Sequence, residues 1–337
     1  MADLYGVAIA DALRGRPVRL PQPFNPDHLL WRAGEHGLHG LLHAAVARRG
    51  DLPLPLKSLE PRLKALTMAQ EAVVRVRLDA AREVAAAFAR VELPAVFVKG
   101  TAVVVLTGGS PGLRPFSDLD VLVSPERVAA AVGLLACIGY REDLTVLRSS
   151  MERRYLRGGG MRPDVAVDLH WQFVERQGPQ AAVRVPVAEI LERRRDGGGI
   201  PVPTAEDCLL LAAVNLVRSR LDRLVLLADF ERLARLGPSW ELVLGRARRW
   251  KLSTALWVSL HHAAGLLGAK VPARVLADLE PPAWQRAALH RLLAGSMLWR
   301  RRKFKRPGWS NVFPLACLDS WRDAAAGIRA WGGRLRN

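Results

Sequence analysis

Apolar residues recur at helical spacing through the first third of the chain. The first such stripe, over residues 27–48, consists of Leu29, Leu30, Ala33, Leu38, Leu41, Leu42 and Val46. A longer stripe of Ala, Val and Leu predicts a second helix over residues 60–91, which Pro94 ends. Residues 1–17 also have an amphipathic pattern, interrupted by two aspartates, which favours a short helix over a signal peptide.

The pattern changes after this helical segment. Ala95–Val98 is a short apolar stretch that predicts a strand, and Lys99–Thr107 predicts a helix that begins directly after it. A turn-rich loop over residues 108–112 leads to a second strand, Leu119–Val123, which is rich in valine. Residues with N-cap and N1 chemistry follow, so we expect a helix from Pro125 to about Ile138.

Two further strands are expected around Thr145–Leu147 and over Val165–Trp171, and Gly158–Gly160 suits the turn of an antiparallel pair. Beyond them, Thr204-Ala-Glu-Asp207 has the spacing of a capping box at a helix start. From there to the end the pattern is almost entirely helical. Breaks are expected at three proline-containing steps: Gly237-Pro238, Val271-Pro272 and Pro281-Pro282.

The order of these elements predicts an α+β fold. A small mixed-sheet core over residues 93–200 would be flanked by an N-terminal helical segment, residues 1–92, and by a C-terminal helical domain with a basic tail, residues 201–337. The length of 337 residues is sufficient for about two domains with a sizeable core.

Composition narrows the class of protein. Half of the residues are hydrophobic and 24% are charged, which excludes a wholly disordered chain. The three cysteines are too few and too scattered for a disulfide framework or a cysteine-based zinc site. No window reaches about 18 uncharged apolar residues, the length that a membrane span requires. We therefore expect a soluble, cytoplasmic protein.

The net charge of +18 is concentrated near the C-terminus and indicates an anionic partner. Residues 281–337 contain 12 Lys and Arg against two Asp, whereas residues 91–172 are balanced at zero. The basic tail interleaves Trp299 and Phe304 with six cations: Arg300, Arg301, Arg302, Lys303, Lys305 and Arg306. Such a segment suits phosphate contacts and base stacking, as in RNA binding, but equally an anionic membrane surface, an acidic protein or a solvated patch.

Asp118-Leu119-Asp120 is the sharpest chemical feature of the sequence. In a strand, residues i and i+2 point to the same side, so both carboxylates face one place while Leu119 points into the core. Two adjacent carboxylates repel each other, and a shared divalent cation relieves that repulsion. Taken alone, the motif would equally fit a solvated strand end.

The neighbouring segments give this motif a chemical context. Upstream, Gly100 and Thr101 lie where a strand turns onto a helix, and the free N–H groups of a helix start can hold a triphosphate. Downstream, Asp168 offers a third carboxylate on another apolar strand, with His170 on the same face.

A glycine turn onto a helix, then D-x-D on a strand, then a single aspartate on a later strand is the layout of the DNA polymerase β-like nucleotidyltransferases. One branch, a family of uncharacterised nucleotidyltransferases, resembles this chain over roughly residues 27–235. The resemblance is carried by Val96-Phe-Val-Lys-Gly-Thr101, Arg114-Pro-Phe-Ser-Asp-Leu-Asp-Val-Leu-Val123, Val167-Asp-Leu-His-Trp171, Val202-Pro-Thr-Ala-Glu-Asp-Cys-Leu-Leu210 and Leu227-Ala-Asp229. It implies a nucleotidyltransferase core within the predicted α+β fold.

The resemblance also implies a two-ion Mg²⁺ site and an NTP substrate. Asp118 and Asp120 would bind two Mg²⁺ ions, one of them also held by the triphosphate. Asp168 would complete the second metal site and help an acceptor hydroxyl or phosphate to attack the α-phosphorus, with release of pyrophosphate. His170 is either an auxiliary catalytic residue or a structural histidine.

Five further residues would bind the nucleotide if the resemblance holds. Gly100 and Thr101 would hold the β and γ phosphates, and Lys99 or Arg114 would neutralise charge on them. Ser117 would cap the loop or contact the triphosphate. The chain has Gly-Thr where the wider superfamily usually has Gly-Ser, and it has Asn215 and Arg218–Arg220 where the family tends to carry a histidine.

Three functions follow from these observations. The first is Mg²⁺-dependent transfer of an NMP to a small-molecule, peptide or protein acceptor. The second keeps the chemistry but makes RNA, such as a tRNA end, the acceptor, recruited by the basic tail. The third is a catalytically silent nucleotide-binding regulatory module, and the intact set of three aspartates argues against it.

Overall fold

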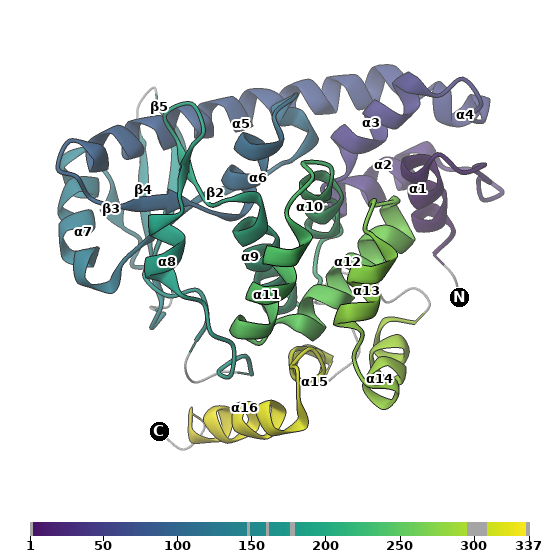
Figure 1. The fold of residues 1–337 in the computed structure, drawn as a ribbon. Helices are drawn as coiled ribbons and strands as arrows, with labels where there is room; N and C mark the ends of the chain where they lie inside the picture. The colour runs from purple at the N-terminus through teal and green to yellow at the C-terminus, as the bar shows by residue number, and fades with distance from the viewer. Residues whose placement is uncertain (1–2, 147–148, 160–161, 176–178, 295–308, 335–337) are drawn as a thin grey trace.

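The computed structural model describes residues 3–146, 149–159, 162–175, 179–294 and 309–334. They form a mostly helical α+β fold with a five-stranded mixed sheet, which confirms the predicted fold class (Figure 1). The strands are β1 (Ala95–Phe97), β2 (Asp118–Val123), β3 (Arg141–Glu142), β4 (Glu152–Gly159), β5 (Arg162–His170), β6 (Arg195–Asp196) and β7 (Pro201–Val202).

The helices before the second half of the chain are α1 (Leu4–Arg14), α2 (Pro26–Glu35), α3 (His39–Arg48), α4 (Leu54–Lys57), α5 (Glu60–Ala89), α6 (Lys99–Thr107), α7 (Val128–Cys137) and α8 (Val187–Glu192), with 3₁₀ turns η1 (Pro111–Leu113) and η2 (Pro125–Arg127). The later helices are α9 (Ala205–Arg218), α10 (Val225–Ala234), α11 (Trp240–Trp250), α12 (Ser253–Leu267), α13 (Ala273–Leu279), α14 (Ala283–Leu293), α15 (Trp309–Ala316) and α16 (Trp321–Arg334).

The main sheet has the strand order β1-β2-β5-β4-β3. Of its four neighbouring pairs, only β2 and β5 are parallel. Alternation along these two strands divides the faces: Leu119, Val121 and Val167 are fully buried on one side, so Asp120 and Asp168 lie on the other. The register that pairs Asp120 with Asp168 puts their Cα atoms side by side.

Helix α5 connects two regions of the molecule. One end of it lies along the main sheet, and the other end reaches α3 and α4 (Figure 1). It contacts β1, β2 and β5, whereas α6 and α8 contact β2, and α6 also contacts α9 and α10. A single cluster of buried apolar side chains runs from Ile9 to Leu318 through the helical parts and the sheet. The division into segments at residues 92/93 and 200/201 stays a prediction.

Most helix boundaries follow local sequence signals. The N-terminal helix is confirmed as α1, in which Asp3 Oδ1 accepts a hydrogen bond from Gly6 N at 2.8 Å. The predicted helix start is confirmed at α9, where Thr204 Oγ1 accepts from Asp207 N at 3.3 Å, although the Asp207 carboxylate accepts from Arg193 and Arg246 and does not close a capping box. The three proline-containing breaks separate α10 from α11, α12 from α13 and α13 from α14.

Two expectations were wrong in detail. The stripe over residues 27–48 forms two helices, because Gly37 adopts a φ of +70° between α2 and α3 and packs beside Pro115 and Val225. The strand expected around residues 145–147 is absent from the described part: Thr145 lies in a turn, Val146 in a bend, and Leu147 falls outside that part. The antiparallel partner of β5 is instead β4, whose polar sequence does not have the apolar pattern of a typical strand.

The C-terminal helices dock against the helical part of the molecule (Figure 1). Asp319 accepts hydrogen bonds from Ser253 N and Thr254 N, at 3.0 and 2.7 Å, at the start of α12. Asp323 of α16 forms an ion pair of 2.6 Å with Lys251. None of the helices in the described ranges is both long enough and apolar enough to span a membrane.

Candidate active site

Three aspartates meet at the centre of the main sheet. Asp118 and Asp120 lie on β2, and Asp168 lies on the neighbouring strand β5, opposite Asp120. Asp120 is 3% exposed and Asp168 is 9% exposed, so the sheet holds these carboxylates largely out of water. The backbone carbonyl of Asp120 also accepts a hydrogen bond of 2.9 Å from Val98 N, which joins β2 to the start of α6. Burial of so much negative charge requires close cationic partners.

Two cations supply this compensation. Lys99, the first residue of α6, donates through Nζ to Asp120 Oδ1. Arg154 of β4 donates to both carboxylate oxygens of Asp168, at 2.7 and 2.9 Å, and to Asp118 Oδ2 at 3.0 Å. The hydrogen bonds to Asp168 raise the pKa of the Arg154 guanidinium above its ordinary value. Arg154 therefore bridges aspartates from two strands.

A histidine continues the network behind Asp120. His170 is fully buried, and its Nε2 lies 2.8 Å from Asp120 Oδ1. Its Nδ1 lies 2.9 Å from Glu152 Oε2, and that carboxylate also forms a 3.2 Å ion pair with Arg218 at the end of α9. Acidic and basic side chains thus alternate from Lys99 through the imidazole to Arg218.

The carboxylates respond differently to this environment. Burial and the charges of Asp120 and Asp168 raise the pKa of Asp118. Burial alone would raise the pKa of Asp120 too, but Lys99 and His170 hold it well below its usual range. Burial likewise opposes ionisation of Glu152, yet the hydrogen bond and charge of His170 lower its pKa to about 2. Asp118 is the carboxylate whose negative charge is compensated least.

The turn before β2 packs tightly on the start of α6. Lys99 has a φ of +53°, a strained value for a residue with a side chain. A Cβ added to Gly100 would lie 2.6 Å from Phe116 Cβ, so the chain needs glycine there. Thr101 is fully buried, and its hydroxyl has no hydrogen-bond partner among the described residues.

A polar pocket of about 140 Å³ adjoins the cluster on the β4 side. It is lined by Glu142, Asp143, Val146, Glu152, Arg153, Arg154 and Asp168. Its wall includes the face of Arg154 and Asp168, so small solutes can reach this pair from solvent.

The donor set suits Mg²⁺, which prefers carboxylate oxygens. Within the described ranges, however, no group of three His, Cys, Asp or Glu side chains is arranged so that it could hold a metal ion. Arg154 holds both oxygens of Asp168 and one of Asp118, and Lys99 holds Asp120. These oxygens become available to a cation only when the basic side chains move.

Comparison with known proteins decides the family. The profile of a family described as "Uncharacterised nucleotidyltransferase" matches residues 22–268, which is more than half of the chain. The chain belongs to this family of uncharacterised nucleotidyltransferases. No curated protein matches significantly. A solved structure, an antigenic nucleotidyltransferase-like protein from Paracoccidioides brasiliensis, is 16% identical, with a TM-score of 0.35 over 61% of this chain and 95% of that chain.

One residue expected to bind nucleotide, Arg114, is engaged with α10 in this family member. Arg114 is 5% exposed, and its Nε and Nη2 donate to the two oxygens of Asp229 on α10 at 2.6 and 2.7 Å, while Nη1 donates to Pro115 O. This guanidinium is fully engaged within the protein. Ser117 is exposed just before β2. Of the predicted set, the structure brings together Lys99 and the three aspartates with His170.

Sequence reasoning missed four residues of the site in this nucleotidyltransferase family member. They are Arg77, Glu152, Arg154 and Arg218. Arg77 of α5 donates to Phe116 O at 2.6 Å and lies near Asp118, whose charge raises the pKa of the guanidinium against the larger lowering by burial. The i, i+2 spacing of Glu152 and Arg154 on a strand would have put them on one face, had β4 been recognised.

Arg300, Arg301, Arg302, Lys303, Lys305 and Arg306 lie outside the described residues. Their assignment to RNA, a membrane or a protein acceptor stays a prediction.

Proposed function

We propose that this chain is a Mg²⁺-dependent nucleotidyltransferase that transfers an NMP from an NTP to a hydroxyl or phosphate of a small-molecule, peptide or protein acceptor. The observation that supports it best is the meeting of Asp118, Asp120 and Asp168 beside the start of α6, in a chain of a nucleotidyltransferase family. A regulatory module would have no need of three aspartates in this costly arrangement.

The aspartates would hold Mg²⁺, with Asp118 and Asp120 on β2 and Asp168 on β5. When bound, the cation neutralises phosphate charge and favours in-line displacement. Asp118 is the strongest candidate for the first contact, because its charge is the least compensated and its pKa is raised. A cation at this position would lower the pKa again by relieving repulsion from the other two aspartates.

The basic side chains would have a second role during the reaction. Arg154 and Lys99 neutralise the aspartates before a nucleotide binds. When released from them, the two cations remain beside the site and can stabilise negative charge that develops on the phosphates. Asp168 Oδ1, freed from Arg154, would accept the proton of the acceptor hydroxyl. His170 would hold Asp120 in place, since it is fully buried and reaches no solvent.

Incubation of the whole protein with Mg²⁺ and each α-labelled NTP tests this function. RNA-free cell extract should supply an acceptor that becomes labelled, and pyrophosphate should be released in equal amount. Asp118→Asn and Asp168→Asn should reduce labelling by at least about 100-fold, because each removes a cation ligand. Asp164→Asn is the matched control, since Asp164 is an exposed aspartate on the same strand β5.

Total RNA in place of the extract tests the second acceptor class. Label in RNA alone would support tRNA-end or other RNA modification, and the tail variant Arg300→Ala/Arg301→Ala/Arg302→Ala should then weaken RNA binding and reduce its salt dependence. Absence of label in every mixture, with NTP binding unchanged in Asp118→Asn, would contradict the proposed function.

A further inference from the structure

A second pocket lies at the other end of α6 from the aspartates, and the proposed function does not use it. It has a volume of about 280 Å³ and is bordered by α1, α3, α10, α12 and the loop after α6. Helix α6 has nine residues, so its two ends are about 13 Å apart. None of the residues that line this pocket belongs to the aspartate cluster.

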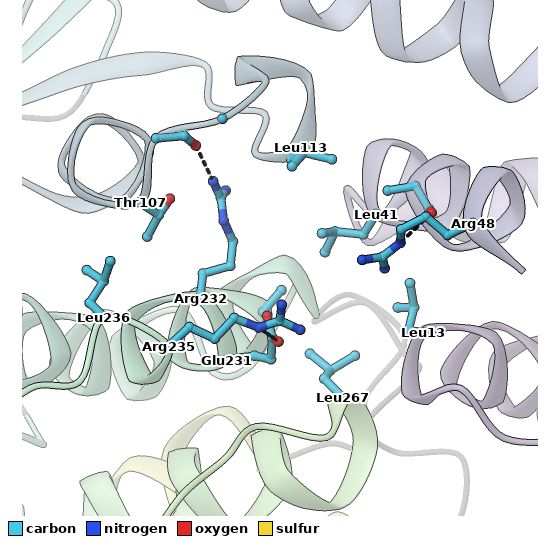
Figure 2. A pocket seen from close by; sticks show the side chains of 14 residues that line it. Leu13, Leu41, Arg48, Thr107, Leu113, Glu231, Arg232, Arg235, Leu236 and Leu267 are labelled. Atoms are coloured by element: carbon cyan, nitrogen blue, oxygen red, sulfur yellow. Dashed lines mark hydrogen bonds and ion pairs between the residues drawn. The ribbon is translucent and has the colours of Figure 1, made fainter.

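Leucine and alanine supply seven of the fourteen residues that line the pocket, and four others are charged: Arg48, Glu231, Arg232 and Arg235. Leu13, Leu41, Leu113, Leu236 and Leu267 point inward from separate elements (Figure 2). An interior lined by branched aliphatic side chains binds apolar groups, because their transfer from water is favourable. The room is suited to a small ligand with a hydrocarbon body.

One buried cation stands inside this apolar wall. Arg232 of α10 is 8% exposed, and its side chain projects from the helix into the pocket towards the loop after α6 (Figure 2). Its Nη2 donates to Gly108 O at a long 3.4 Å, whereas Nη1 is buried and has no hydrogen-bond partner among the described residues. Burial of an unused guanidinium donor is costly unless a ligand satisfies it.

The nearby carboxylates are already committed to other cations. Asp229, one turn earlier on α10, holds both of its oxygens against Arg114. Glu231 forms an ion pair with Arg235, whose side chain is 64% exposed. Among the described residues Arg232 therefore has no dedicated counterion, which also fits the direction of its pKa, which burial lowers.

We propose that this pocket binds a small amphiphilic carboxylate, with its hydrocarbon body among the leucines and its carboxylate on the Nη1 donor of Arg232. A carboxylate there would supply both a hydrogen bond and a counterion, which is the strong form of arginine recognition. Gly108 and Gly109 line the pocket beside the guanidinium, and neither has a side chain that would fill the space there. This inference does not rest on the proposed function.

Titration of the whole protein with octanoate, octan-1-ol and octylamine tests the proposal without any nucleotide. Calorimetry should show saturable binding of octanoate, with a rise in Tm, and binding at least about tenfold weaker for the alcohol and the amine, because a hydrogen bond to a charged group discriminates by that amount. Equal affinity for the alcohol or the amine, or no binding of octanoate, would overturn the proposal.

Variants assign the effect to the buried arginine. Arg232→Gln should weaken octanoate binding at least about tenfold, whereas Arg235→Gln, which removes an exposed and ion-paired cation directly after the same helix, should change it less than about threefold. Equal losses in both variants would overturn the assignment. If Arg232→Gln does not fold, Leu236→Trp serves instead: Leu236 is 42% exposed, so the indole is tolerated, and it should abolish octanoate binding by filling the pocket.

Discussion

Two aspartate–arginine pairs in this protein have similar hydrogen-bond distances but differ in their exposure to solvent and in their number of charged partners. Arg114 meets Asp229 at 2.6 and 2.7 Å, with side chains only 6% and 4% exposed, and Asp229 has no other ion-pair partner in the described part of the chain. Arg154 meets Asp168 at 2.7 and 2.9 Å, but its side chain is 33% exposed and it also holds Asp118. We call the first pair closed, because its two charged groups form an ion pair with each other alone in the described part of the chain. We call the second pair shared, because Arg154 holds two carboxylates.

The difference indicates that the first pair stabilises the fold, whereas the second belongs to the candidate active site. The Arg114–Asp229 pair joins the loop before β2 to α10, across 115 positions of sequence, and neither group can leave without stranding the other. In the cluster, three aspartates and Glu152 share Lys99, Arg154, His170 and Arg218. Arg154, Asp120, His170 and Glu152 each have two such partners, so a cation or phosphate can replace one of them and leave the other in place.

Removal of half of the closed pair should have the largest effect on stability. Asp229→Ala leaves the Arg114 guanidinium buried and uncompensated, so the free energy of unfolding should fall by about 3–5 kcal/mol, measured by urea denaturation at pH 7. The double variant Arg114→Met/Asp229→Leu removes both charges and should recover most of that loss. A single-variant loss under about 1 kcal/mol would show that this pair is as adaptable as the cluster.

A smaller and pH-dependent effect is expected at Glu152. Its folded pKa of about 2 lies below the ordinary 4.5, so its ionised form stabilises the fold above about pH 4.5, and that contribution disappears as the pH falls towards 2. Glu152→Gln should therefore lower the free energy of unfolding by about 1–2 kcal/mol at pH 7 and by progressively less in acid. Urea denaturation at several pH values measures this, with the exposed Glu126→Gln as control. A difference that does not shrink below pH 4.5 would contradict the assigned partners.

The smallest effect on stability, and one of opposite sign, is expected at Asp118. Its raised pKa means that its negative charge destabilises the folded state at neutral pH. Asp118→Asn removes the repulsion from Asp120 and Asp168, so the protein should be as stable as the parent or more stable by up to about 1 kcal/mol. Urea denaturation beside Asp229→Ala makes the contrast direct. A loss above 1 kcal/mol would place Asp118 with the structural pairs.

Local patterns predicted the elements whose burial is periodic or continuous. The long stripe became α5, and the apolar runs around Val96 and Val121 became β1 and β2. The chain from Glu152 to Gly159 escaped recognition, because a strand with one polar face and several arginines lacks the apolar alternation of a typical strand. The break at Gly37 was also missed: the chain there takes a φ of +70° and passes close to Pro115 and Val225, which lie far along the sequence.

The sequence by itself determined which acidic residues share one face of a strand and which family the chain belongs to. The i, i+2 spacing puts Asp118 and Asp120 on one face of a strand, and the surrounding motifs identify the family. Only the tertiary structure decided which cation meets which carboxylate. The register of β4 on β5 gave Arg154 to Asp168, and the docking of α10 gave Arg114 to Asp229. Such pairings depend on strand register and helix packing between distant segments, and the spacing of residues along one chain does not specify either.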